Sequence, residues 1–493
     1  MRAPAPLPAL VGALALTLPV LVAGCGSEEA ASPLDAALGY LPSNAPMVAV
    51  VTTDPDDPGF QALDQLVNGF PGGAQLAENA LGTVLPAGLD FEDQIAPLLG
   101  NDLVVGVPDA EALAEEGFVA AIQAPDSDAA QALADGTGVS EVGEAEGATI
   151  YEVEGGTLAI DDDIVLFADT RERLEAALVQ RAEEDGSLDQ QIFDEALADL
   201  PADAPVRVYA DAPAILAAIP EVQQARSVAW IAALETLGLA LSPEGDRLGL
   251  ELDLATDSAG LTDADLPIAA SPGAPPRVLA RSGELGAGIA EPGQTLRFGK
   301  LVADALVPGG VGLVESQLGI DVDELARQVG DEAFLSLGAD GGFALRADLR
   351  DPRGFEAALA RIARLLPLIT AAVGIEGIAL DPVDAPGDAL YVLRVPDRAP
   401  LTVGVVGGIL VAVEDPGQAA ELAGAAPRAV PGAEGTVVVR GDGQLLLEQV
   451  LSPLAGLLGG PLVNAFLEPI GDVEGSLEAD TSGIRGRFTL TLE

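Results

Sequence analysis

Residues 248–254, with the sequence LGLELDL, alternate leucine with glycine or an acidic residue. A period of two gives a β-strand one apolar face and one polar face, which is typical of a half-buried strand. The turn-forming segment 242–245 (SPEG) separates this strand from an apolar run at 237–241. Two strands joined by so short a turn predict a hairpin, and therefore antiparallel pairing.

The same order of apolar strands and Ala-rich helical segments occurs twice along the chain, at a period of roughly 230–245 residues. The matched segments are 88–93 with 319–324, 103–107 with 333–337, 117–122 with 342–347, 148–151 with 388–391, 164–169 with 409–414, 206–211 with 437–442, and 246–252 with 484–490. The segments expected to be helical are 127–135 and 172–181 in the first copy, and 352–365 and 417–424 in the second.

Strands separated by short turns, with helices inserted in blocks, are typical of an α+β fold. The sequence therefore predicts two tandem duplicated lobes, each a mostly antiparallel sheet with helices packed on one face. The first lobe is expected at residues 36–260 and the second at 277–493. A segment rich in Asp, Ala, Ser and Pro at 261–276 is predicted to be the crossover linker between them.

The N-terminus predicts export and lipid anchoring. Residues 9–23 are almost entirely apolar, which fits a signal peptide and is shorter than the ~20 residues of a membrane span. The run ends in Val22-Ala23-Gly24-Cys25, which resembles a lipobox. We expect a lipoprotein signal peptide at 1–24, cleavage between Gly24 and Cys25, and lipidation of Cys25. Residues 25–35 are then the lipidated N-terminus and a flexible tether.

The composition narrows the classes of function. The chain has 493 residues, 78 acidic and 23 basic side chains, and a net charge of −55, so we expect no nucleic-acid partner. Hydrophobic residues make up 49%, which favours a folded protein, but aromatic residues are only 3%. Cys25 is the one cysteine, so no disulfide within the chain is expected.

A short segment near the start of the first lobe resembles a known family. Residues 40–46 (YLPSNAP) lead into the apolar strand 47–51 and then Thr53-Asp54-Pro55, and 70–72 (FPG) follows. This pattern is similar to the exported bacterial family catalogued as domain of unknown function 3352. The resemblance implies an extracytoplasmic protein, and it supplies no activity and no site residues. The spacing recurs at 200–205 (LPADAP), which favours a structural role.

The sequence contains no pattern that predicts catalysis. The chain has no histidine, so it lacks His-based triads and His-ligated metal sites. We therefore expect no catalytic residues, no cofactor and no metal. The acidic runs 54–57 (DPDD) and 161–163 (DDD) lack the spacing of a calcium-binding hand, and 161–163 is predicted to be a hairpin turn. The adhesion-type tripeptide 440–442 (RGD) is predicted to be a strand-end turn.

Two functional hypotheses remain, with a carboxylate-dependent glycoside hydrolase as a third. The first is a non-enzymatic lipoprotein on the extracytoplasmic face of the cell membrane, which binds or scaffolds an envelope protein. The alternative is a carrier of a lipid or other apolar ligand in a cavity between sheet and helices. Apolar residues at 445–470 and 365–375 are the expected cavity walls, although they also fit an ordinary core.

Overall fold

The computed structural model describes the chain from Ser32 to Leu492 with internal gaps. The described ranges are 32–68, 94–115, 117–136, 138–183, 186–218, 220–245, 247–270, 276–279, 283–339, 342–372, 377–383, 389–396, 398–446 and 470–492. Gly24 and Cys25, with the rest of the predicted signal peptide, lie outside these ranges. Segments 69–93 and 447–469 lie outside them as well.

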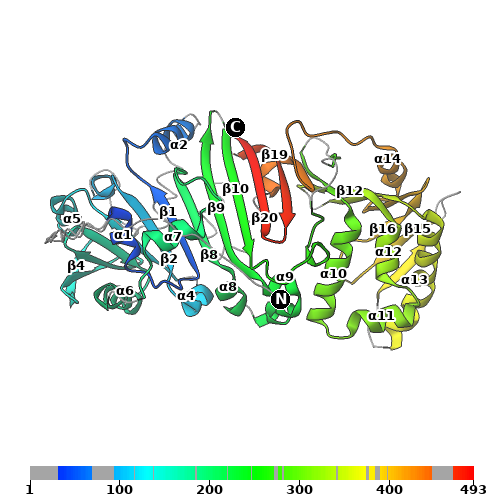
Figure 1. The fold of residues 1–493 in the computed structure, drawn as a ribbon, viewed down its shortest axis with the longest axis horizontal. Helices are drawn as coiled ribbons and strands as arrows, with labels where there is room; N and C mark the ends of the chain where they lie inside the picture. The colour runs from blue at the N-terminus through cyan, green and yellow to red at the C-terminus, as the bar shows by residue number, and fades with distance from the viewer. Residues whose placement is uncertain are drawn as a thin grey trace, which may run out of the picture.

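Twenty strands of the described residues form a single antiparallel sheet (Figure 1). The first half of the sheet contains β1 (Met47–Thr52), β2 (Asp102–Val107), β3 (Val119–Gln123), β4 (Ser140–Ala145), β5 (Ala148–Val153), β6 (Gly156–Asp161), β7 (Ile164–Ala168), β8 (Val206–Asp211), β9 (Leu234–Glu244) and β10 (Arg247–Thr256). The second half contains β11 (Glu284–Ala290), β12 (Val329–Gly338), β13 (Phe343–Leu349), β14 (Ala379–Pro382), β15 (Ala389–Arg394), β16 (Leu401–Val406), β17 (Ile409–Val413), β18 (Val437–Asp442), β19 (Ile470–Asp480) and β20 (Gly483–Leu492).

The strands pair in one linear order. Across the sheet the order is β4-β5-β6-β7-β3-β2-β1-β8-β9-β10-β20-β19-β18-β11-β12-β13-β17-β16-β15-β14. The pairing of β11–β20 therefore repeats that of β1–β10 strand for strand. The two halves meet where β10 pairs with β20.

Helices pack around the sheet in both halves. In the first half they are α1 (Pro33–Leu38), α2 (Pro58–Asn68), η2 (Ala96–Leu98), α4 (Ala110–Glu115), α5 (Ser127–Ala134), α6 (Arg171–Glu183), α7 (Gln190–Ala196), α8 (Ala212–Ala218), η3 (Pro220–Ser227) and α9 (Ala229–Ala232). After them come η4 (Asp263–Asp265), α10 (Pro292–Leu306), α11 (Gly310–Leu318), α12 (Val322–Gln328), α13 (Pro352–Ala372), η5 (Pro416–Gln418) and α14 (Ala419–Gly424). Within the described ranges, no helix has the length and apolar character needed to cross a membrane.

The α+β class and the antiparallel sheet agree with the sequence prediction, but the prediction of a separate sheet in each lobe is wrong. Nine residue pairs join β10 to β20, from Arg247↔Thr491 to Ala255↔Gly483. Without this pairing each half would end in a long edge strand with unpaired N–H and C=O groups. Joining the two strands satisfies both edges at once.

The prediction that helices cover one face of each sheet is also wrong for the first half. One face of β3 and β7 packs against Leu38 of α1, Leu174 of α6 and Phe193 of α7. The opposite face packs against Leu98 of η2 and Leu133 of α5. Strands β3 and β7 are apolar along nearly their whole length, so both of their faces must be shielded from water.

Contacts outside the sheet strengthen the junction between the halves. The Trp230 ring of α9 lies edge-on to Phe298 of α10, with centroids 5.9 Å apart and planes at 87°. The buried Gln294 amide donates to the carbonyl oxygens of Asp263, Ala264 and Leu266, at 3.2, 3.1 and 2.7 Å. The described part of the predicted crossover is therefore packed and hydrogen-bonded.

We predict that Phe488→Ala lowers the free energy of unfolding by about 3–5 kcal/mol, because it removes a buried ring from the β10–β20 junction. Urea unfolding followed by fluorescence of Trp230, the one tryptophan, measures the effect. The control is Val142→Ala on β4, whose side chain is exposed; its cost should stay within about 0.5 kcal/mol. Equal costs for the two variants would contradict a structural role for the junction.

Candidate functional site

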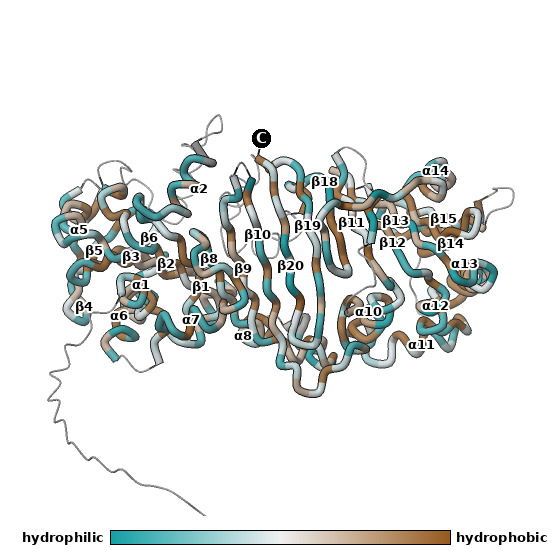
Figure 2. The backbone as a smooth tube through the Cα atoms, turned by 45° about the horizontal axis from the view of Figure 1, so that its top comes forward, coloured by the Kyte–Doolittle hydropathy of each residue, from teal (hydrophilic) through white to brown (hydrophobic). Residues whose placement is uncertain are grey.

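The polar face of the central strands carries rows of opposite charge. Within the register, Glu251 and Asp253 of β10 lie opposite Arg487 and Arg485 of β20. On the other side of β20, Glu478 of β19 lies opposite Arg485. Since alternate residues of a strand point to the same face, these side chains share one surface of the sheet. Figure 2 shows the alternation of hydrophilic and hydrophobic residues along β10 and β20.

These charges form ion pairs across the strands. Arg487 Nε lies 3.5 Å from Glu251 Oε1, and Arg485 Nε lies 3.7 Å from Asp253 Oδ1. Next to them, Arg440 of β18 lies 3.1 Å from Glu474 of β19. Directly opposed charges of unlike sign stabilise a sheet modestly, so this pattern also fixes the register at the junction.

Asp253 is the most buried carboxyl group of this surface. Burial raises its pKa above the ordinary range, and the neighbouring Asp199 carboxylate acts in the same direction. Arg485 opposes this shift without cancelling it. The Asp253 side chain therefore takes up a proton more readily than an exposed aspartate, which would weaken its ion pair with Arg485 at acidic pH.

Walls from both halves turn this surface into a groove. On the β9 side, Leu197 and Leu200 follow α7 and lie against Gly238, where an added Cβ would meet both leucines within 3 Å. On the β18 side, the loop 430–434 is held by Val430, which packs with Val278 and Val438. The space between these walls, which we call the central groove, has a volume of about 570 Å³.

The central groove offers side chains for recognition. Its floor and walls include Arg247, Arg485, Arg487, Ser476 and Thr489. The Arg487 side chain is 74% exposed despite its contact with Glu251, so a ligand can reach the guanidinium. A ligand that presents alternating charges and hydrogen-bonding groups would match this surface.

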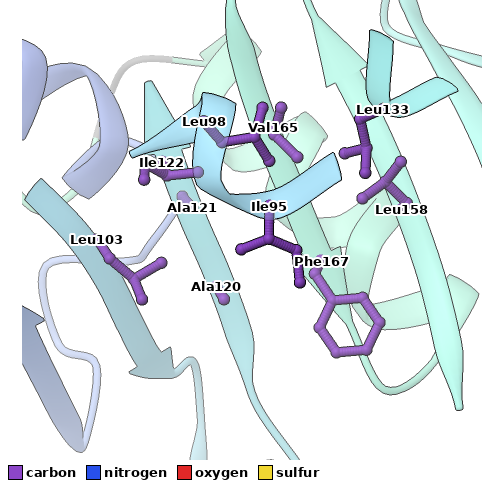
Figure 3. A pocket seen from close by; sticks show the side chains of 10 residues that line it. All are labelled: Ile95, Leu98, Leu103, Ala120, Ala121, Ile122, Leu133, Leu158, Val165 and Phe167. Atoms are coloured by element: carbon purple, nitrogen blue, oxygen red, sulfur yellow. The ribbon is translucent and has the colours of Figure 1, made fainter. Parts of the chain in front are cut away.

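A second cavity is apolar and much smaller. It lies between η2 and the β3–β7 face of the first half and has a volume of about 20 Å³ (Figure 3). Its lining includes Ile95, Leu103, Leu133, Leu158 and Phe167. This volume is about that of a single water site, so the cavity is a packing defect of the core and cannot hold a lipid.

The walls predicted for a lipid carrier are only partly described. Of residues 445–470, the structure describes 445, 446 and 470, so this prediction lies mostly outside the described residues. Of residues 365–375, the described ones belong to α13. Leu368 on this helix is 66% exposed and faces solvent.

The acidic runs singled out in the sequence have structural partners. Asp161 and Asp163 flank the β6–β7 hairpin turn, as predicted, and accept hydrogen bonds from Tyr40 Oη and Gln123 Nε2 at 2.7 and 2.9 Å. Asp57 Oδ1 accepts from the Phe60 amide at the start of α2, at 2.9 Å. In the described part of the chain, no three His, Cys, Asp or Glu residues are grouped so as to hold a metal ion.

The tripeptide 440–442 forms the last three residues of β18 and pairs with β19, so its place at the end of a strand is as predicted but it is strand and not turn. Asp442 Oδ1 accepts hydrogen bonds from the amides of Gln444 and Leu445, at 3.0 and 3.3 Å. The matched Asp211 at the end of β8 likewise accepts from Ala214, at 2.7 Å. Both aspartates cap the backbone that follows the strand.

Residues 40–42 anchor the first turn of the fold to the sheet. Tyr40 is almost fully buried, and Leu41 packs where an added Cβ on Gly106 would lie 2.3 Å from its Cδ1. The Leu41 carbonyl accepts a hydrogen bond from the Leu188 amide at 2.7 Å. This segment is therefore structural, as the repeated spacing in the sequence indicates.

Sequence reasoning did not identify the central groove. The signal was present in residues 484–487, where two arginines alternate with an apolar residue and a glycine in a chain with few basic residues. Their acidic partners precede them by more than 230 positions. Only the pairing of β10 with β20 shows that the two rows face each other.

Comparison with known proteins gives one family and no characterised relative. The family model described as "Protein of unknown function (DUF3352)" matches residues 8–272, more than half of the chain. No curated protein matches. The match ends before β11 begins at Glu284.

Three solved structures resemble part of the chain weakly. "Structure of crystal form IV of TP0453" has 12% identity and a TM-score of 0.28, and the match covers 44% of this chain and 80% of that chain. Crystal form III has 11% identity and a TM-score of 0.27, with 46% and 82% covered. Crystal form I has 13% identity and a TM-score of 0.29, with 46% and 80% covered. Scores this low do not establish a common fold.

We predict that Tyr40→Phe lowers the free energy of unfolding by about 1.5 kcal/mol near neutral pH, because Asp161 loses its hydrogen bond. Burial, and then the hydrogen bond to Asp161, raise the pKa of the Tyr40 phenol. Its contribution is therefore complete below the ordinary tyrosine pKa of about 10 and falls as the pH rises above it. Denaturant unfolding at several pH values should show the two proteins converging above pH ~10. A constant difference across that range would contradict this role.

Proposed function

The chain belongs to the family described as "Protein of unknown function (DUF3352)", and we propose that it is a lipid-anchored extracytoplasmic protein that binds an envelope protein in the central groove. The central groove carries the binding part of this proposal, since it combines a volume of about 570 Å³ with charged side chains from both halves. We assign it no catalytic activity.

The anchor rests on the sequence of the N-terminus. Val22-Ala23-Gly24-Cys25 ends an apolar run of signal-peptide length, and no other cysteine is present. A thioether-linked lipid on Cys25 would hold the folded body close to the membrane through the short tether. In this proposal the protein lies on the extracytoplasmic face of the cell membrane.

We also propose that residues 36–260 and 277–493 are tandem copies joined through 261–276. The identical pairing order of β1–β10 and β11–β20 supports this. Arg247 corresponds to Arg485 in the sequence match, and by the same offset Leu250 corresponds to Phe488. Leu250 and Phe488 are also direct partners in the sheet. The halves are therefore related by a pseudo-twofold axis through that pair, as in a symmetric dimer fused into one chain.

The partner that fits the central groove best is an extended polar segment of an envelope protein. Rows of acidic and basic side chains about one strand apart can pair with alternating charges on such a segment. The apolar carrier ranks second, because the apolar cavity of about 20 Å³ is far too small for a lipid. A glycoside hydrolase ranks third, because Glu251 and Asp253 are both engaged with arginines.

We predict that the membrane-bound protein begins at a lipid-modified Cys25, and that Cys25→Ser abolishes the modification and the release of residues 1–24. Mass spectrometry of the N-terminal peptide from the membrane fraction measures both. Ser27→Ala, two positions away, is the control and should leave the modification intact. An unmodified Cys25 in the mature wild-type protein would rule out the anchor.

We predict that a photoreactive amino acid in place of Thr489 or Ser476, both in the central groove, crosslinks one discrete envelope protein on intact cells. The same amino acid in place of Glu172, exposed on α6, is the matched control and should not capture it. Adding Arg487→Glu should weaken capture from the groove positions about tenfold or more, because it reverses a charge that faces the ligand. Capture of the same protein from position 172, or no capture from the groove positions, would contradict binding in the central groove.

A further inference from the structure

Exposed apolar side chains are concentrated on one set of helices. Ten large apolar side chains of the described residues are exposed, and seven of them belong to α10, α11, α13 or the residue that ends α10. The seven are Leu296, Leu301, Leu306, Val307, Leu313, Val314 and Leu368. Val307, Leu313 and Leu368 are 63%, 54% and 66% exposed, so more than half of each side chain contacts water.

These helices lie next to one another. Helices α10 and α11 are in contact, and so are α11 and α13, in the second half of the molecule (Figure 1). Lys300 of α10 joins Glu315 of α11 and Asp323 of α12 at 2.9 and 2.7 Å. The Arg361 guanidinium of α13 donates to the Gly319 carbonyl at the end of α11. The seven exposed apolar residues therefore belong to one group of contacting helices, and together we call them the helical patch.

Helical spacing places much of the helical patch on common faces. On α10, Leu301 lies on the side of Gln294, seven residues before it in the chain, whereas Leu296, the exposed Ala303 and Leu306 recur at intervals of seven and three residues on the other side. Leu296, Ala303 and Leu306 therefore lie on the side of α10 opposite the buried Gln294, whose amide bonds to the carbonyls of Asp263, Ala264 and Leu266. The helix is thus amphipathic in an unusual sense, because its solvent-facing side carries exposed apolar groups.

Basic residues without acidic partners accompany the helical patch. Arg353, Arg361 and Arg364 of α13 are exposed, and none of them forms an ion pair within the described ranges. Arg364 and Leu368 are four residues apart, so both lie on one face of α13. Residues 292–372 contain eleven acidic and eight basic side chains, against 78 and 23 in the whole chain. This region is much closer to neutral than the rest of the protein.

We propose that the helical patch docks on the surface of an anionic phospholipid membrane. Leucine and valine side chains would enter the boundary between head groups and acyl chains, and the guanidinium groups of Arg353 and Arg364 on α13 would bind lipid phosphates. The patch fits anionic lipid because Arg353 and Arg364 are exposed and form no ion pair among the described residues, so their positive charge is available to lipid phosphates. In the cell this docking rests on the lipid anchor proposed above, which raises the local concentration of membrane so that a weak contact suffices.

The docking can be tested without the anchor. A chain that begins at Gly26 keeps all described contacts, which start at Ser32, and carries no lipid. Its co-sedimentation is measured with vesicles of phosphatidylcholine alone and with equimolar phosphatidylcholine and phosphatidylglycerol. We expect binding to the mixed vesicles and weak binding to phosphatidylcholine, with suppression by salt.

Variants distinguish docking through the helical patch from non-specific adhesion of the protein to vesicles. Leu313→Ser with Val314→Ser should lower partitioning about tenfold or more, and Arg364→Gln should lower it roughly fivefold for anionic vesicles. The matched control is Val179→Ser with Ile192→Ser, at exposed apolar positions of α6 and α7 in the first half. Thermal unfolding of each variant checks that the fold is intact. Equal partitioning of patch and control variants would overturn the proposal.

A second readout uses the lipidated protein. Because lipid occupies the thiol of Cys25, Leu313→Cys introduces the one free thiol, which can carry a polarity-sensitive fluorophore. Lipid-borne quenchers should quench a label at position 313 and should spare one at Val179→Cys. The wild-type protein could instead bind no vesicles and form a concentration-dependent dimer that Leu313→Ser abolishes. That result would identify a second copy of this chain as the occupant of the helical patch. If the helical patch does not dock in a protein whose Cys25 is lipidated, the docking proposal is wrong and the proposal of a lipid anchor still stands.

Discussion

The pairing of β10 with β20 is the interaction on which the rest of the structure depends. It converts two ten-strand units into one sheet and removes the two longest edges that those units would otherwise expose. The pairing is centred on Leu250 and Phe488, which are both buried in a shared apolar cluster with residues of β18 and β19. The apolar face of the junction therefore supplies most of its stability, and the polar face is left for charged side chains.

The near absence of aromatic residues imposes a second constraint. With aromatics at 3%, the core consists mainly of Ala, Val, Leu and Ile, whose small side chains must approach closely to exclude voids. Glycine makes such approaches at Gly106, which receives Leu41, and at Gly238, which receives Leu197 and Leu200. The contact at Gly238 also places the wall of the central groove. Close packing of an aliphatic core and the shape of the groove are thus consequences of the same residues.

Much of the local structure is predictable from the sequence. The alternation at 248–254 and the apolar runs at 103–107 and 164–169 correctly predict β10, β2 and β7, and residues 127–135 correctly predict α5. These predictions succeed because each rests on a periodicity contained within one element. The prediction of helices on one face failed at β3 and β7, where continuous apolar runs without alternation already indicate two buried faces.

The joining of the halves and the central groove are not contained in any local pattern. Glu251 and Arg487 are paired through a register that depends on contacts between segments more than 230 residues apart. Asp253 illustrates the consequence: the alternation predicts a solvated carboxylate on the open face of a strand, yet the structure buries it beside Asp199 and Arg485. Whether a polar side chain on this strand is exposed depends on the walls of the central groove, and the sequence of the strand alone does not encode those walls.

The placement of basic residues links the groove to the helical patch. In a chain with 78 acidic and 23 basic side chains, each arginine has many potential acidic partners. Arg487 remains 74% exposed in the groove, and Arg364 has no acidic partner among the described residues of α13 and its neighbours. An acidic surface disfavours anionic partners over most of the molecule. Exposed guanidinium groups at these two sites weaken that field locally, which is a physical means of directing a partner to the groove and a lipid surface to the helices.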